Sequence, residues 1–130
     1  MRIEVDPRAP TPPSEQIADQ VRFAVAGGRL TPGDRLPSVR GLAAQAVVNP
    51  NTVARAYREL EREGTVETRP GSGVFIAPGA TARCRKDARQ VLAERLGRAV
   101  EEALAAGLSP EQIERLVARL LRGATQEVLP

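Results

Sequence analysis

One stretch of the chain decides the fold: Val48-Asn49-Pro50-Asn51-Thr52-Val53-Ala54-Arg55-Ala56-Tyr57-Arg58-Glu59-Leu60-Glu61-Arg62-Glu63-Gly64. Asn49 predicts an N-cap, and Pro50 suits the first helical position, where a missing N–H costs nothing. Gly64 is the residue expected just past the end. Helical spacing then defines one apolar stripe, made of Val53, Ala56, Tyr57 and Leu60. The pattern predicts an amphipathic helix with both ends marked.

The opposite face of this helix carries Asn51, Arg55, Arg58 and Arg62. A polar first turn followed by Asn and Arg is typical of a recognition helix in the DNA major groove. The predicted DNA contacts here are Asn49, Pro50, Asn51, Thr52 and Arg55. For Asn49, a cap alone and a cap that also contacts DNA are both open. Arg58 and Arg62 alternate with glutamates, so pairs at i,i+3 or i,i+4 predict a solvated face for them.

Two further helices are expected before this one. A proline-rich arm, residues 1–13, leads into a helix that opens at Ser14 and ends at Gly27-Gly28. Ser38 is the predicted N-cap of a short helix over 39–46, and its hydroxyl and neighbouring N–H groups are suited to a phosphate. The close connection from this short helix to Asn49 predicts a helix-turn-helix.

Beyond Gly64 the periodicity changes from 3.6 to 2. Residues 65–69 and 74–76 predict two short strands, with Val66 and Phe75 as inward contacts. Such a hairpin is marginal alone and must pack on the preceding helices. Its tip, Gly71-Ser72-Gly73, together with Arg69, is predicted to form a wing that approaches DNA closely. A simple hairpin turn is the alternative interpretation of the same residues.

The rest of the chain predicts a pair of helices. Residues 78–81 are the expected linker, and a helix of about 82–106 stops at Gly107. Ser109, Pro110 and Gln112 match a capping box that opens a last helix, expected to end at Gly123. The apolar stripes of the two helices predict a dimer interface: Val91, Leu92, Leu96, Val100, Leu104, Ile113, Leu116, Val117, Leu120 and Leu121. Folding back onto the winged part is the alternative.

Composition excludes several classes of protein. With one cysteine, Cys84, and no histidine, the chain lacks a disulfide framework and the usual zinc ligands. No signal-like segment or long apolar run occurs, so no membrane association is expected and we predict a cytoplasmic protein. No nucleophile with a base is apparent, so we predict neither an enzyme nor a cofactor. The formal net charge of +3 is too small to indicate a polyanion partner by itself.

Three motifs in chain order carry a resemblance: Leu36-Pro37-Ser38-Val39-Arg40-x-Leu42-Ala43, Val48-Asn49-Pro50-Asn51-Thr52-Val53-x-Arg55-Ala56-Tyr57-x-x-Leu60-Glu61-x-x-Gly64, and Arg69-x-Gly71-Ser72-Gly73-x-Phe75. They resemble the DNA-binding domain of the GntR family of bacterial transcription regulators. Because the C-terminal part is short and helical, it resembles the YtrA-like subfamily. The resemblance implies a homodimer, often regulating nearby transporter genes, and implies that Arg40 contacts DNA.

Two positions depart from the family pattern. Many members have glycine at the position of Val47, where the turn uses a positive φ that a β-branched residue adopts reluctantly. We therefore expect the turn to differ locally. Many members also have an Arg-Glu pair at Ala54-Arg55, so here the arginine lies one residue further along.

The fold class predicted is mainly α with a small β-hairpin. Residues 1–77 form a winged helix-turn-helix DNA-binding domain, 78–81 the linker, and 82–130 a two-helix dimerisation region. The predicted function is a sequence-specific transcription regulator, expected to be a repressor that binds a palindromic operator in double-stranded DNA as a homodimer. A protein-interaction adaptor without specific DNA binding is the alternative. A small-molecule effector is a further hypothesis, and its pocket is not placed; a ligand would change half-site spacing at the hinge around Pro78-Gly79 or at the face between the winged domain and the helix of about 82–106.

Overall fold

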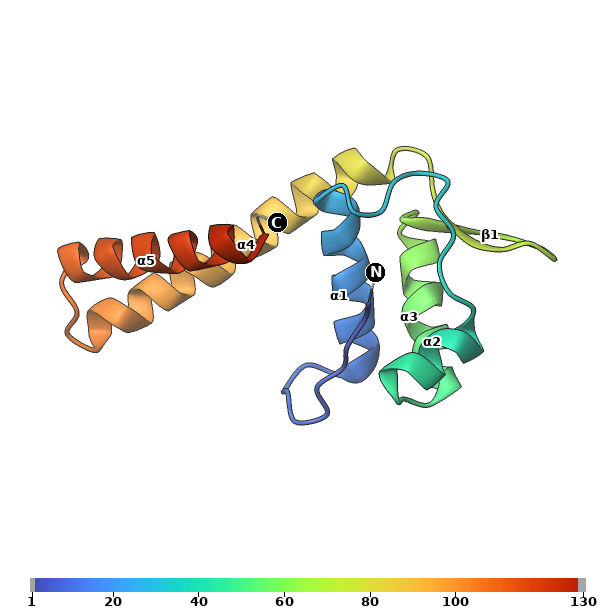
Figure 1. The fold of residues 1–130 in the computed structure, drawn as a ribbon, viewed down its shortest axis with the longest axis horizontal. Coiled ribbons are helices and arrows are strands. Elements are labelled where there is room, and N and C mark those ends of the chain that lie inside the picture. The colour runs from blue at the N-terminus through green and yellow to red at the C-terminus, as the bar shows by residue number, and fades with distance from the viewer. Residues whose placement is uncertain (1, 129–130) are drawn as a thin grey trace. The chain divides into compact units, whose positions relative to one another are not determined.

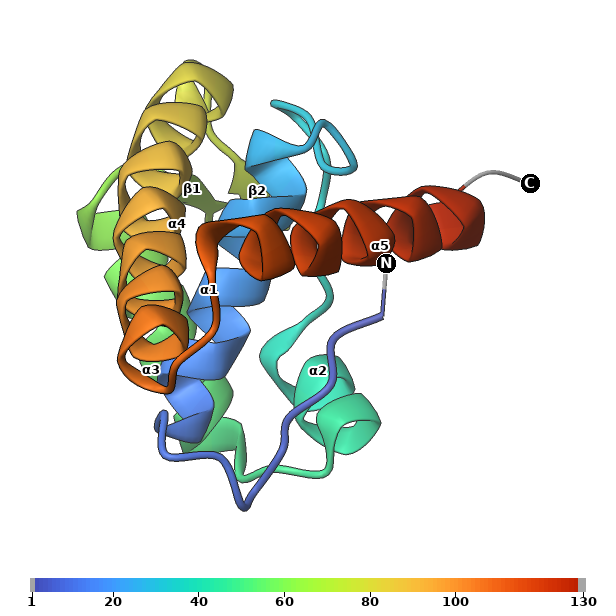
Figure 2. The same cartoon turned by 90° about the vertical axis from the view of Figure 1, so that its left-hand side faces the viewer.

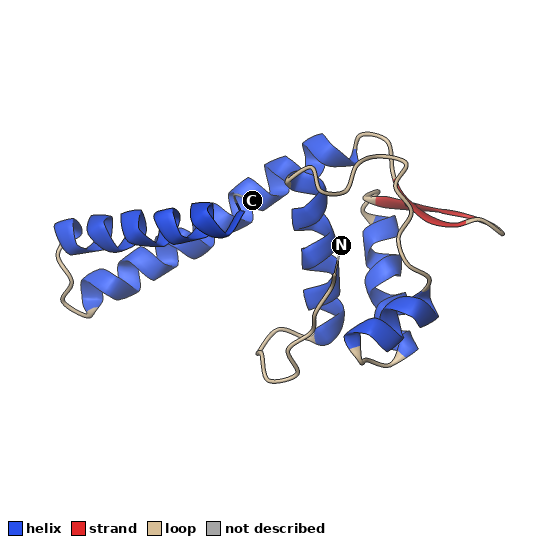
Figure 3. Ribbon diagram, viewed as in Figure 1, coloured by secondary structure: helices blue, strands red, loops and turns tan. Residues whose placement is uncertain are grey.

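The computed structural model describes residues 2–128 (Figure 3). Within them lie five helices and one two-stranded antiparallel sheet, as the sequence predicts. In chain order the elements are α1 (Pro13–Ala26), α2 (Val39–Ala46), α3 (Pro50–Arg62), β1 (Val66–Arg69), β2 (Gly73–Ile76), α4 (Ala80–Ala105) and α5 (Pro110–Val128). The chain forms two compact units that divide within α4, the first ending at Arg89 and the second beginning at Gln90.

The core of the first unit lies between α1, α3 and the short α2 (Figure 1). The apolar stripe of α3 is buried as expected: Val53, Ala56 and Leu60 are fully buried and Tyr57 is 5% exposed. Burial of one large apolar side chain contributes roughly 1.5–3 kcal/mol, so this stripe fixes which face of α3 points outward. That outward face carries the polar residues.

The N-terminal arm is held against α1 by two glutamine side chains. Gln20 bonds both backbone groups of Glu4, through its Oε1 (3.1 Å) and its Nε2 (2.6 Å). Gln16 does the same for Asp6, with both distances 2.9 Å. This pairing brings Ile3 into the core, where it is 3% exposed. The arm therefore belongs to the folded unit.

The hairpin pairs Val66 with Ile76 and Glu67 with Phe75. Since successive side chains in a strand point to opposite faces, Val66 and Ile76 share the inner face, and both are buried. The expectation that Phe75 points inward is wrong, because this register puts it on the outer face. A third segment extends the sheet: the amide of Leu36 donates to the carbonyl of Val74 and that of Gly33 to Ile76, each across 2.8 Å.

Helix α4 begins at Ala80, within the expected linker. Its first turns lie on the winged unit, where Ala80 is fully buried and Cys84 is 3% exposed. Because these small side chains fit the core, the helix starts as soon as the Pro78-Gly79 turn allows.

The second unit is a helical hairpin. At the start of α5 the predicted capping box is confirmed: the amide of Ser109 donates to Gln112 (2.8 Å) and the amide of Gln112 donates to the Ser109 hydroxyl (3.1 Å). The predicted end at Gly123 is wrong, since α5 continues to Val128. Gly123 is helical because one glycine costs only about 1 kcal/mol in a helix. The two helices diverge from their connecting turn (Figure 2). None of the described helices is long and apolar enough to cross a membrane.

Candidate nucleic-acid interface

The N-terminus of α3 is built as the sequence predicts. The side-chain oxygen of Asn49 accepts a hydrogen bond from the backbone amide of Asn51 (2.8 Å), and Pro50 occupies the first turn. In this cap Asn49 Oδ1 is the acceptor, so the side-chain NH2 group of Asn49 can still donate to another partner. The side chains of Asn51 and Arg55 are exposed, and Thr52 is half-buried. The first turn of α3 therefore presents polar groups to the outside.

The N-terminus of α2 lies beside the same end of α3 (Figure 1). Ser38 is the N-cap, as predicted, and its hydroxyl accepts from the amide of Gly41 (3.0 Å). Arg40 is exposed on the first turn. The hydroxyl of Tyr57 donates to the carbonyl of Pro37 (2.8 Å), which fixes the loop before α2 against α3. Two helix N-termini, each suited to anionic groups, are thus held as one surface.

The turn between α2 and α3 has the left-handed conformation despite its β-branched residue. Val47 has φ 56° and ψ 55°, and it is the only non-glycine residue with positive φ in the described chain. The expected local departure of the turn is therefore wrong. Its amide bonds the carbonyl of Ala43, and the amide of Val48 bonds the same carbonyl at 3.0 Å. The strain at Val47 costs free energy. These backbone hydrogen bonds, together with the burial of α2 and α3 on either side of the turn, outweigh that cost.

The wing projects from the C-terminal side of α3, away from α1 (Figure 1). At its tip, Gly71 and Ser72 are exposed, and Gly73 has φ 125°, a conformation that favours glycine. Arg69 is paired with Glu67 (2.9 Å), and its guanidinium lies 4.2 Å from the centre of the Phe75 ring. The outer face of the sheet thus holds Arg69 in a defined position.

Arg35 also belongs to this face, although no sequence pattern selected it. Arg35 lies in the third segment of the sheet, where its backbone forms an antiparallel bridge with Phe75. Its guanidinium group lies beside Gly73. A Cβ on Gly73 would be 2.8 Å from Arg35 Nε, so the glycine makes room for this cation. A three-residue extension after a Pro-Gly turn has too little periodicity to be predicted. The turn composition of Pro32-Gly33 was the one available signal.

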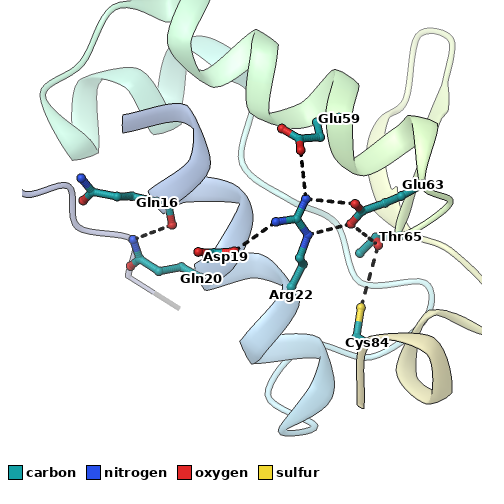
Figure 4. A network of polar contacts seen from close by, with 8 residues as sticks. All are labelled: Gln16, Asp19, Gln20, Arg22, Glu59, Glu63, Thr65 and Cys84. Carbon is teal, nitrogen blue, oxygen red and sulfur yellow. Dashed lines mark hydrogen bonds and ion pairs between the residues drawn. The ribbon is translucent and has the colours of Figure 1, made fainter. Parts of the chain in front are cut away.

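Several exposed cations of the winged unit have no ion pair with any residue in the part of the chain that the structure describes. They are Arg35, Arg40, Arg55, Arg58 and Arg62. For the last two, the predicted pairing with neighbouring glutamates is wrong. Glu59 and Glu63 instead contact Arg22 of α1 (Figure 4). Glu61 accepts a hydrogen bond from the Thr68 hydroxyl.

The Arg22 network also shifts pKa values. Burial raises the pKa of Glu63, but hydrogen bonds from Arg22 and Thr65 outweigh it and hold that pKa below its ordinary range. The hydrogen bond with Glu63 raises the pKa of Arg22 although burial opposes this. Both groups are therefore charged at neutral pH. Thr65 in turn contacts the buried thiol of Cys84 at 3.8 Å, which extends the network to α4 (Figure 4).

Together these features define the class of protein: a winged helix-turn-helix protein whose exposed helix N-termini and wing form a cationic, DNA-binding type of surface. Residues 13–76 match the family described as bacterial regulatory proteins, gntR family. The chain is 40% identical over 115 residues to the HTH-type transcriptional repressor YtrA of Bacillus subtilis, covering 88% of each chain. The chain belongs to the GntR family and is a DNA-binding transcription regulator, not an enzyme.

Solved structures agree with this assignment. A transcriptional regulator from Oenococcus oeni matches with a TM-score of 0.68 and 35% identity, over 90% of this chain and 97% of that one. YtrA from Sulfolobus acidocaldarius, a GntR-family transcription factor, matches with a TM-score of 0.58 and 34% identity, over 75% of this chain and 99% of that one. The resemblance to the GntR family and its YtrA-like members, drawn from the sequence, is confirmed.

Proposed function

We propose that the chain is a repressor that binds a palindromic operator in double-stranded DNA as a homodimer. The observation that carries this proposal is the joint surface at the N-termini of α2 and α3, which the Tyr57–Pro37 hydrogen bond holds together. Repression is inferred from the similar Bacillus protein, which is named a repressor. A repressor needs no chemistry beyond occupying its site.

The proposed DNA contacts come from three elements. The N-terminus of α2 supplies phosphate contacts, the first turn and a half of α3 meets base edges, and the wing reaches the adjacent groove. All of these residues lie in the winged unit, and all except Thr52 and Gly73, which are half-buried, are exposed: Ser38, Arg40, Asn49, Pro50, Asn51, Thr52, Arg55, Arg69, Gly71, Ser72 and Gly73. Their placement on the outward faces of α2, α3 and the hairpin supports the proposal.

Dimerisation is proposed from the apolar residues of the second unit. Leu96, Leu120 and Leu121 are 65%, 62% and 63% exposed. In a single chain these side chains stay in water and forgo the free energy that burial would contribute. Two such hairpins packed as a bundle cover these side chains, and twofold symmetry is the commonest arrangement. The proposed interface residues are Val91, Leu92, Leu96, Val100, Leu104, Ile113, Leu116, Val117, Leu120 and Leu121. Of these, only Ile113 is half-buried and the rest are exposed.

A dimer also suits the proposed operator. Two winged units related by a twofold axis select a palindrome, because each reads one half-site. Linking two binding surfaces raises the overall affinity by roughly 10²–10⁴ without any additional interaction, so weak half-site binding is sufficient. Control of transporter genes, which the family resemblance implies, is a further part of this proposal, as are a cytoplasmic location and a small-molecule effector that acts through the hinge at Pro78-Gly79 or the face beside α4. A change in operator affinity or melting temperature across a metabolite panel would identify the effector.

Selection of duplexes from a random pool by the full-length protein tests this proposal. We expect recovery of one inverted-repeat sequence, and footprinting across the genome would locate it at promoters. Sedimentation of the full chain should give a dimer, and Leu96→Glu with Leu120→Glu should give a monomer with about 100-fold weaker binding. Recovery of unrelated sequences, or a monomer that binds as tightly as wild type, would overturn it. Arg98→Glu, outside the predicted interface set in the same unit, is the matched control.

A further inference from the structure

The carboxylates of α3 point toward α1 and the wing, away from the arginines of their own helix. Glu63 receives two hydrogen bonds from Arg22, from Nε (2.8 Å) and Nη2 (2.9 Å) (Figure 4). Glu59 lies 3.4 Å from the same guanidinium group, and Asp19 lies 3.1 Å from it. The Arg22 side chain is 22% exposed, so these pairs are weakly screened compared with surface pairs. Arg22 of α1 therefore forms ion pairs with two glutamates at the C-terminal end of α3, Glu59 and Glu63.

This arrangement changes the electrostatics of the exposed face of α3. The third glutamate, Glu61, bonds the Thr68 hydroxyl of β1. Arg58 and Arg62 are exposed and form no ion pair within the described residues. Had Glu59 been available, its spacing from Arg55 and Arg62 would favour helical i,i+4 and i,i+3 pairs. The position of Arg22 leaves the arginines without such neighbours.

The unpaired arginines continue the face that carries Asn51. At 100° per residue, Asn51, Arg55, Arg58 and Arg62 lie within one narrow sector of α3. Arg62 lies about 10 Å further along the axis than Arg55, at 1.5 Å per residue. The major groove is about 12 Å wide, so a helix that meets base edges with its first turns carries its later residues past the groove to the phosphates. Arginine is suited to phosphate oxygens because its donors form a planar fork.

Resting on the proposed function, we infer that Arg58 and Arg62 extend the DNA-binding surface to backbone phosphates, and that Arg22 keeps Arg62 available by holding Glu59. Arg22 is thus a positioning residue for the DNA-binding face, although it lies on a different helix and points inward.

The first test measures binding to phosphates directly. The probes are a duplex selected from a random pool by wild type and a scrambled duplex of the same length. Arg58→Gln and Arg62→Gln should each weaken binding about three- to tenfold on both probes at 0.15 M salt, because phosphate contacts carry no sequence information. Each should also reduce the slope of log K against log salt by about one, the value for one phosphate left unneutralised. Arg29→Gln, an exposed arginine after α1, is the matched control and should change neither quantity.

The second test separates positioning from folding. Arg22→Gln should weaken binding several-fold, since it releases Glu59 toward Arg55 and Arg62. Adding Glu59→Gln and Glu63→Gln to Arg22→Gln should restore the affinity, although that variant has none of the ion pairs. In the wild-type background the same two glutamate changes should raise affinity less. The extra gain in the Arg22→Gln background is the coupling that the inference requires. Circular dichroism and melting curves confirm that each variant is folded at the assay temperature.

The outcomes distinguish this inference from the function on which it rests. If wild type binds neither probe with a salt-dependent constant, the proposed function fails. If wild type binds but Arg58→Gln and Arg62→Gln keep its affinity and salt slope, the two arginines do not reach the phosphates and the inference fails. If the glutamate changes give equal gains in both backgrounds, Arg22 has no positioning role and its network is purely structural.

Discussion

The hydroxyl of Tyr57, on the buried face of α3, donates a hydrogen bond to the backbone carbonyl of Pro37, immediately before the N-cap of α2. The tyrosine is 5% exposed, so its ring is part of the core while its hydroxyl fixes a loop. Since Ser38 and Asn49 cap the two helices that meet here, this hydrogen bond ties the loop before one proposed DNA-contacting terminus to the helix that carries the other. The core and the interface are thus connected through a single side chain.

Tyr57→Phe is expected to remove this hydrogen bond without creating a cavity. The free energy of unfolding should fall by about 1 kcal/mol, the ordinary net value of one such bond. Affinity for a selected duplex should fall by less than tenfold, because the loop before α2 loses its tether but not its backbone path. Urea titration and a binding isotherm measure the two effects. Unchanged affinity would show that the remaining packing alone positions Ser38.

The same residue predicts a pH dependence. Burial raises the pKa of Tyr57 above its ordinary value of about 10. Below pH 10 the tyrosine is protonated in both the folded and the unfolded chain, and its contribution is constant. Above it, the unfolded chain ionises first, so stability falls as pH rises, by about 1.4 kcal/mol per pH unit for this group. The difference in unfolding free energy between wild type and Tyr57→Phe should therefore shrink and reverse above pH 10. A constant difference would contradict the buried hydroxyl.

Local sequence signals predicted three helix N-termini correctly. Ser38, Asn49 and Ser109 were each expected to cap a helix, and each side chain accepts the hydrogen bond that a cap requires. Such signals succeed because a cap involves groups only two or three residues apart. The α3 stripe was equally clear, because its spacing depends on the helix alone.

Features that depend on tertiary partners could not be predicted in this way. The alternation of residues 74–76 predicts that Phe75 points inward, but one residue of register decides which face a strand side chain takes. Arg22 lies 41 positions from Glu63 in the chain, and nothing in either segment indicates their pairing. The prediction for Arg58 and Arg62 failed for the same reason, since helical spacing permits an ion pair but does not exclude a better partner.

Val47 offers a stabilising change. Its left-handed conformation costs a β-branched residue roughly 1–2 kcal/mol, and its side chain, 88% exposed, gains little from burial. Val47→Gly removes that strain but adds freedom to the unfolded chain, which offsets part of the gain. We expect a net stabilisation of about 1 kcal/mol and unchanged DNA affinity. Val47→Ala keeps a Cβ in the same conformation and serves as the control, with a smaller gain expected. Destabilisation by Val47→Gly would show that the valine side chain makes stabilising interactions of its own.

Gly73 and Gly71 form a matched pair for testing the wing. Both have positive φ, 125° and 77°, so an alanine at either position is strained. A Cβ at Gly71 would meet no atom within 4 Å, whereas one at Gly73 would lie 2.8 Å from Arg35 Nε and must displace that guanidinium. Both substitutions should lower the melting temperature, but Gly73→Ala should lower affinity for a selected duplex several-fold more than Gly71→Ala. Arg35→Gln should reproduce this additional loss without the strain. Equal losses for the two glycines, with wild-type binding by Arg35→Gln, would show that Arg35 does not contribute to DNA binding.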